Sequence, residues 1–243
     1  MKLMGKTALV TGAAGNGLGR SIALTLAREG ANVVVNYRSS TDKAQQIVDH
    51  ITAGGGKAAA VQGDVFTAEG VNALVEGAKA TFGPIEICII GPGGEFHVTP
   101  LDQTDAATAL KNVQDETAPL FHLMGIVLPG MVDRNWGRII GIGTHPEKLS
   151  PSFTYNAGKM ARMQALLLMR DECWQHGITV NILAPGPVMP VESFDDAVEL
   201  MQHGAAWQNR KNVTPQDAAE TVAFLCSDAG DYISGCVLPL LFH

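Results

Sequence analysis

The feature that most constrains the fold is a regular alternation of short β-branched runs with longer stretches whose apolar residues recur at i, i+3 and i+4. That spacing marks one face of a helix, whereas the β-branched runs are typical of buried strands. Strands are predicted at residues 6–11, 32–37, 57–62, 85–90, 138–143 and 178–183, with helices at 18–29, 43–53, 69–82, 103–132 and 155–176. The alternation predicts an α/β protein, a doubly wound parallel sheet with helices on both faces.

The composition supports one compact domain that spans residues 1–243. The chain is 46% hydrophobic and 17% charged, which suffices for a full core and excludes a disordered chain. Its net charge of −7 disfavours nucleic acid and anionic membranes, because both present negative phosphates. No apolar stretch approaches the roughly 18 residues of a membrane span. We therefore expect a soluble protein with neither nucleic acid nor membrane as a partner.

Cysteine usage bears on location and on metals. The four cysteines, at positions 88, 173, 226 and 236, show no C-x-x-C or Cys/His cluster spacing. This pattern predicts neither a disulfide framework nor a metal site. We expect a cytoplasmic protein in a reducing compartment.

A glycine-rich turn follows the first predicted strand and opens the first predicted helix. It reads Thr11-Gly12-Ala13-Ala14-Gly15-Asn16-Gly17-Leu18-Gly19-Arg20. A dinucleotide pyrophosphate binds where backbone N–H groups gather at a helix N-terminus, and glycines let the backbone approach it closely. The general G-x-G-x-x-G spacing is absent, so the place of the turn between a strand and a helix carries the prediction of a dinucleotide site.

A second motif, Tyr155-Asn156-Ala157-Gly158-Lys159, lies on the predicted helix after the fifth strand. The i, i+4 spacing puts Tyr155 and Lys159 on one helical face, where an ammonium can lower the pKa of a phenol. With this pair the chain resembles the short-chain dehydrogenase/reductase family of NAD(P)-dependent oxidoreductases, over nearly all of its length. The other motifs that carry the resemblance are Gly63-Asp64-Val65, Gly137-Arg138-Ile139-Ile140, Asn181 and Ala184-Pro185-Gly186.

The resemblance implies a single-domain Rossmann-type fold of about seven strands, a homo-oligomer (dimer or tetramer) and a small carbonyl or alcohol substrate. Tyr155 is the implied general acid, Lys159 binds the nicotinamide ribose and tunes Tyr155, and Thr144 orients the substrate oxygen. The expected cofactor-binding residues are Gly12, Asn16, Gly17, Leu18, Gly19, Arg38, Ser39, Asp64, Val65, Gly91, Tyr155, Lys159, Pro185, Gly186 and Val188.

The end of the second predicted strand indicates which nucleotide is preferred. An Asp or Glu there accepts both ribose hydroxyls and selects NAD, but residues 35–40 read Val-Asn-Tyr-Arg-Ser-Ser and hold no carboxylate. Arg38 and Ser39 instead offer a cation and a hydroxyl to a 2′-phosphate, with Arg20 as a further candidate. The sequence therefore predicts NADP(H).

Several positions depart from the family pattern around the expected active site. Glu116 stands where the family has an asparagine, so its carboxylate can either replace a water relay or form an ion pair with Lys159; we count it as a catalytic candidate. Residues 90–94, Ile-Gly-Pro-Gly-Gly, replace the family's Asn-Asn-Ala-Gly, and we expect a looser backbone there. Thr144 takes the place of a serine, and His145 beside it is a second candidate contact.

These residues predict an NADP(H)-dependent carbonyl reductase or alcohol dehydrogenase. Two alternatives stay open: a lyase or isomerase that uses Tyr155 and Lys159 without net hydride transfer, and a nucleotide-binding protein with little catalysis. Residues 185–213, which begin with three closely spaced prolines and contain a short helical pattern, predict a substrate lid.

Overall fold

The computed structural model describes residues 2–98, 100–145, 150–208 and 210–240. One parallel sheet of seven strands has the order β3-β2-β1-β4-β5-β6-β7. The strands are β1 (Thr7–Val10), β2 (Asn32–Tyr37), β3 (Lys57–Gln62), β4 (Ile87–Ile90), β5 (Gly137–Ile142), β6 (Ile178–Pro185) and β7 (Val237–Leu240). The α-helices are α1 (Leu18–Arg28), α2 (Thr41–Ala53), α3 (Ala68–Phe82), α4 (Ala106–Arg134), α5 (Phe153–Trp174), α6 (Phe194–His203) and α7 (Pro215–Cys226). This is the Rossmann-type α/β fold that the sequence predicted.

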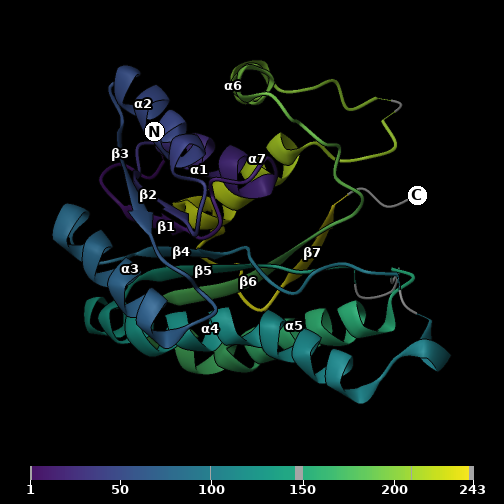
Figure 1. Cartoon of the computed structure of the whole chain (residues 1–243). Helices are drawn as coiled ribbons and strands as arrows, with labels where there is room; N and C mark the ends of the chain where they lie inside the picture. Colours follow the sequence, from purple (N-terminus) through teal and green to yellow (C-terminus); the bar gives the residue numbers. More distant parts are fainter. Residues whose placement is uncertain (1, 99, 146–149, 209, 241–243) are drawn as a thin grey trace.

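Helices cover the sheet on both faces (Figure 1), with α1, α2 and α7 on one side and α3, α4 and α5 on the other. Alternate residues of the central strands enter the two cores: Val10 packs in the core of the first layer and Leu9 in that of the second. Every residue of β1, β4 and β5 is buried. Burial on both faces is why these strands read as continuous apolar runs.

The strand order reverses between β1 and β4, which pair directly. Chain connections run away from this point in opposite directions, so a crevice opens at the carboxyl ends of these two strands. The turns that follow β1 and β4 meet at this switch point, and they contain the glycine-rich residues 11–17 and 91–94.

The two long helices α4 and α5 pack against each other beneath this crevice. The Asp105 carboxylate caps α4 by accepting from the Thr108 N–H, 2.9 Å away, and the Ser152 hydroxyl caps α5 by accepting from the Tyr155 N–H, 3.4 Å away. Such caps satisfy donors at the helix start that have no partner within the helix. The second cap fixes where Tyr155 enters its helix.

The segment after β6 leaves the sheet and returns to it. The Met189 N–H donates to the Val213 carbonyl at 2.8 Å, and between these residues lies α6, whose start matches the short helical pattern of the sequence. In the described part of the chain, no helix is long and apolar enough to cross a membrane. That residues 185–213 act as a lid stays a prediction.

Candidate functional site

The turns after β1 and β4 are joined by hydrogen bonds and by close packing. The Thr11 hydroxyl donates to the Ile89 carbonyl at 2.8 Å and accepts from the Gly91 N–H at 3.0 Å. Gly12 has a φ of +62°, and a Cβ there would lie 2.7 Å from Pro92 Cγ. Only glycine fits this position, because both the backbone conformation and the space require it.

Asn36, at the carboxyl end of β2, links three segments from a buried position. Its Oδ1 accepts from the Gly12 N–H at 3.1 Å, and its Nδ2 donates to the Gly63 carbonyl at 3.0 Å. The amide therefore fixes the glycine-rich turn against the end of β3. No role was predicted for Asn36, although a polar residue in an otherwise apolar strand is a usable signal.

The start of α1 has the features of an anion site. Its N-cap, Gly17, makes no side-chain capping bond, and a Cβ on Gly17 would meet no atom within 4 Å. Gly19 packs tightly instead, since its Cβ would lie 2.8 Å from the Gly12 carbonyl oxygen. The first-turn N–H groups and the open side of Gly17 fit a dinucleotide pyrophosphate.

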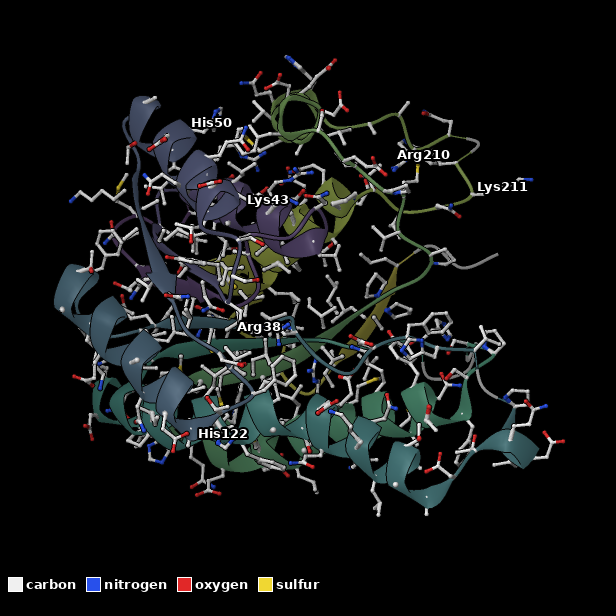
Figure 2. All side chains as sticks on the ribbon, in the orientation of Figure 1. Arg38, Lys43, His50, His122, Arg210 and Lys211 are labelled. Carbon is white, nitrogen blue, oxygen red and sulfur yellow. The ribbon has the colours of Figure 1, made fainter. Side chains whose placement is uncertain are left out.

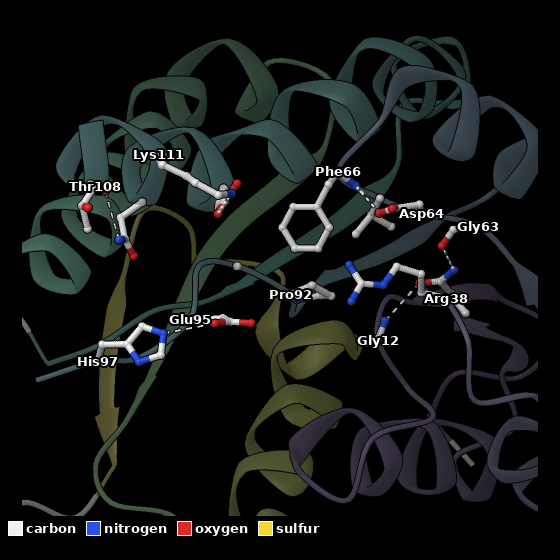
Figure 3. Close-up of a pocket in the computed structure, with 15 residues that line it drawn as sticks. Gly12, Arg38, Gly63, Asp64, Phe66, Pro92, Glu95, His97, Thr108 and Lys111 are labelled. Carbon is white, nitrogen blue, oxygen red and sulfur yellow. Dashed lines mark hydrogen bonds and ion pairs between the residues drawn. The ribbon is translucent and has the colours of Figure 1, made fainter. Parts of the chain in front are cut away.

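A cavity of about 710 Å³ opens beside this turn. Arg38 extends into it near Gly12 and Pro92 (Figure 3), and its Cζ lies 5.9 Å from the centre of the Phe66 ring. Asp64 accepts from the Phe66 N–H at 3.0 Å. The lining thus includes the predicted cofactor residues Gly12, Arg38, Asp64 and Val65, together with Asn36, Gly63, Phe66, Pro92 and Gly93.

Other predicted cofactor residues lie around the same edge of the sheet. Asn16 accepts from Lys43 of α2 at 3.0 Å and lines a separate small cavity of about 130 Å³. Ser39 is exposed, and Leu18 begins α1. Pro185 ends β6, Gly186 donates its N–H to the Leu240 carbonyl at 3.3 Å, and Val188 pairs with Val213.

Arg20 does not share the cavity with Arg38. Its guanidinium is buried, and it donates to the Val191 carbonyl and, at 3.4 Å, to the Glu192 carbonyl. Figure 2 shows Arg38 between the two helical layers and Lys43 on α2. Arg38 is therefore the basic side chain that reaches the cavity from the end of β2.

Tyr155 and Lys159 lie one turn apart on α5, with the lysine Nζ 5.3 Å from the centre of the tyrosine ring. The ring of Phe96 meets that of Tyr155 edge to face, with centroids 5.2 Å apart. Burial raises the pKa of Tyr155, and the Glu116 carboxylate raises it further, whereas Arg162 lowers it. The expected lowering of this pKa is therefore wrong, because burial disfavours the phenolate.

Glu116 forms the ion pair that was one of its two predicted arrangements. Its Oε1 lies 3.1 Å from Lys159 Nζ and accepts from the Gly94 N–H at 3.0 Å, and its Oε2 lies 3.1 Å from Arg162 Nη2. Glu116 and Arg162 are fully buried and Lys159 is 6% exposed. The three side chains form a buried charge cluster of two cations and one anion.

Thr144 follows the carboxyl end of β5, beside the same crevice. It is half-buried, and its backbone N–H points to Met163 Sδ at 3.5 Å. The neighbouring His145 is also half-buried. Residues 146–149, which separate them from α5, lie outside the described part of the chain.

Residues 6–199 match the family model described as short chain dehydrogenase. The chain belongs to this family. Among its relatives is versicolorin reductase of Emericella nidulans, which is 31% identical over 98% of this chain and 94% of its own length. A 3-oxoacyl-[acyl-carrier-protein] reductase of Staphylococcus epidermidis is 32% identical over 96% of both chains.

Solved structures agree with the fold over nearly the full length. A 7α-hydroxysteroid dehydrogenase in complex with NADH and 7-oxo glycochenodeoxycholic acid has a TM-score of 0.84 and is 30% identical, covering 98% of this chain and 94% of its own. A blue fluorescent protein from a metagenomic library, in complex with NADPH, has a TM-score of 0.82 at 26% identity, covering 99% and 98%.

Proposed function

We propose that this short-chain dehydrogenase is an NADP(H)-dependent carbonyl reductase, which in the reverse direction oxidises a secondary alcohol. The observation that carries the proposal is the pairing of Tyr155 and Lys159 on α5, with Lys159 Nζ 5.3 Å from the centre of the Tyr155 ring. The pair lies near a crevice whose glycine-rich turn fits a dinucleotide. A half-buried tyrosine with a raised pKa keeps its proton at neutral pH. The proton is therefore present for transfer to a carbonyl oxygen, although the raised pKa makes the phenol a weaker acid.

The bound nucleotide would supply the hydride, and the residues of this chain would manage the charge and the proton. As the carbonyl carbon accepts a hydride, negative charge develops on its oxygen. Tyr155 donates its phenolic proton to that oxygen, and Thr144 orients the oxygen through its hydroxyl. Lys159 adds positive charge beside Tyr155 and offers its ammonium to the nicotinamide ribose.

The preference for a 2′-phosphate is proposed from Arg38. This cation reaches the cavity from the end of β2, and residues 35–40 contain no carboxylate to select NAD. A guanidinium pairs with a phosphate through charge-assisted hydrogen bonds. The solved relatives include one complex with NADH and one with NADPH, so the fold accommodates either nucleotide and the local residues decide.

The test is to mix the purified protein with NADPH or NADH and a panel of ketones of graded size. Absorbance of the reduced nucleotide and loss of the ketone are followed together. Oxidation of NADPH in proportion to ketone loss supports the proposal. Ketone conversion without NADPH oxidation would point to the lyase or isomerase, and binding without conversion would point to the weakly catalytic protein.

We further propose a cytoplasmic homo-oligomer. Large apolar side chains are exposed on both long helices, with Phe121 of α4 at 60% and Leu168 of α5 at 75%. Exposed apolar residues on neighbouring helices suit a contact between copies of the chain. Sedimentation of the protein with and without Leu168→Glu tests this, because the charge would favour the monomer.

A further inference from the structure

Arg162 joins four parts of the active-site region from a fully buried position on α5. Its Nε donates to the Glu116 carbonyl of α4 at 2.7 Å. Its Nη1 donates to the carbonyls of Gly91 and Ile142, each at 3.3 Å, and its Nη2 donates to the carbonyl of Pro92. A single side chain thus ties α4, the turn after β4 and the end of β5 to α5.

The same guanidinium also balances the charge of Glu116. Its Nη2 lies 3.1 Å from Glu116 Oε2, while Glu116 Oε1 lies 3.1 Å from Lys159 Nζ. An arginine keeps its positive charge in proteins, and a buried charge is stable only when it is paired. Glu116 therefore lies between two cations. Removal of either Arg162 or Lys159 changes the net charge around the one that remains.

Two glycines make room for this arrangement. A Cβ on Gly93 would lie 2.3 Å from Glu116 Oε2, and one on Gly158 would lie 2.9 Å from Glu116 Cγ. Both distances are shorter than real carbon contacts. The glutamate, the arginine and the two glycines consequently fit together as one unit.

We infer that Arg162 is a positioning residue for the proposed reaction: it holds Glu116 against Lys159, adds a second positive charge to the buried cluster, and ties down the turn that lines the nucleotide cavity. The inference rests on the proposed function. It adds a residue that acts through Lys159 rather than on the substrate.

The electrostatics of the cluster support this role. Burial lowers the pKa of Lys159 to about 8, Arg162 lowers it in the same direction, and Glu116 opposes them. The charged groups that act on Lys159 are Arg162 on its own helix and Glu116 on α4, while Tyr155 presents its ring. The turn after β4 meets the cluster with its backbone, through the Gly94 N–H and the Gly91 and Pro92 carbonyls.

The decisive variant is Arg162→Met, which removes the cation and leaves Glu116 to pair with Lys159 alone. Its matched control is Arg138→Met. Arg138 of β5 is also buried, bonds two backbone carbonyls, those of Gly137 and Gly177, and pairs with the half-exposed carboxylate of Asp231. Arg138 lies at the opposite end of β5 from Ile142.

The first readout is kcat/KM for NADPH against pH, which reports groups of the free enzyme. We expect the alkaline limb of this pH profile to lie near pH 8 in the native protein, where Lys159 loses its proton. In Arg162→Met the limb should move up by about one pH unit, because the cation that lowers the pKa of Lys159 is gone. Adding Glu116→Gln to Arg162→Met should move the limb back down. Arg138→Met should leave it in place. Identical limbs for Arg162→Met and the native protein would overturn the inference.

Arg162→Lys separates charge from packing and guards against a poorly folded methionine variant. It keeps the cation, so the alkaline limb should stay near that of the native protein. It loses the planar fork, so KM for NADPH should rise as the Gly91 and Pro92 carbonyls lose donors. A limb shifted as far as in Arg162→Met would show that packing, not charge, causes the effect.

A readout without turnover distinguishes failure of the inference from failure of the proposed function. Because Lys159 has a lower pKa folded than its ordinary value near 10.4, the unfolded chain binds more protons between about pH 8 and pH 10. Stability contributed by this group therefore rises with pH across that window. The rise in Tm from pH 8 to pH 10, relative to Arg138→Met, should shrink in Arg162→Met. An unchanged rise would overturn the inference even if no ketone is ever reduced.

Discussion

The two halves of the candidate site are built in opposite ways. At the glycine-rich turn, backbone groups and exposed side chains surround an open cavity, and Arg38 reaches it without a buried partner. Beneath the crevice, Glu116, Lys159 and Arg162 form a buried charge cluster in which each member contacts another within 3.1 Å. Loss of Arg38 removes one contact with a ligand, whereas loss of any member of the cluster changes the charge around the other two.

The difference follows from solvation. An exposed cation is screened and hydrated, so its loss removes one interaction with a ligand and little else. A buried cation whose partner is removed keeps its desolvation penalty without compensation, and such a loss destabilises a protein by about 3–5 kcal/mol. Substitutions in the nucleotide region should therefore change binding, and substitutions in the buried charge cluster should change stability and pH dependence.

The largest effect is expected from Tyr155→Phe, which keeps the ring and removes the proton donor. Turnover should fall by about 10²-fold or more, while NADPH affinity measured by fluorescence titration stays close to native. Tyr232→Phe is the control, because that ring is 92% exposed. Native turnover in Tyr155→Phe would remove Tyr155 from the mechanism.

Next come two glycines, one from each region. A Cβ on Gly93 would lie 2.3 Å from Glu116 Oε2, whereas one on Gly17 would meet nothing within 4 Å. Gly93→Ala should lower the free energy of unfolding by about 1–3 kcal/mol, the usual range for overpacking. Gly17→Ala should leave it nearly unchanged and instead weaken NADPH binding. Denaturant unfolding and NADPH titration of both variants test whether one loses stability and the other loses nucleotide affinity. Equal free energies of unfolding for the two variants would contradict the prediction.

A smaller effect is expected at the cavity entrance. Arg38→Ala should weaken NADPH binding about ten-fold, since a charge-assisted hydrogen bond contributes on the order of 1.5–3 kcal/mol, and should leave NADH binding unchanged. Lys79→Ala removes an exposed cation of α3 as a control. Equal affinity of the native protein for the two nucleotides would refute the assignment of Arg38.

The smallest expected effect on activity is a shift in pH dependence, although loss of the buried carboxylate should also lower stability. Glu116→Gln removes the one group that raises the pKa of Lys159, so that pKa should fall below about 8. The alkaline limb of kcat/KM for NADPH should then move to lower pH, by roughly one unit or less. A superimposable profile would show that the Glu116 carboxylate does not act on Lys159.

The sequence predicts the sheet well and the buried charge cluster in part, whereas the nucleotide-binding roles stay predictions. The six strands of residues 6–183 were predicted correctly because burial on both faces makes apolar runs. The ion pair of Glu116 with Lys159 was one of two predicted arrangements.

The remaining errors concern tertiary contacts. Arg162 was missed because its partners come from α4, β5 and the turn after β4, which no local pattern brings together. Its position three residues after Lys159, on the same helical face, was the available signal. The direction of the Tyr155 pKa was wrong because i, i+4 spacing does not reveal burial. The turn at residues 90–94 was expected to be loose, yet Arg162 holds two of its carbonyls.

The contact of Arg20 with the segment after β6 has a kinetic consequence. Arg20 stands on the first turn of α1, and its guanidinium bonds the carbonyls of Val191 and Glu192. Displacement of that segment must break these bonds at the helix that would bind the pyrophosphate. Release of the nucleotide and exchange of the substrate should therefore share the barrier of moving this segment.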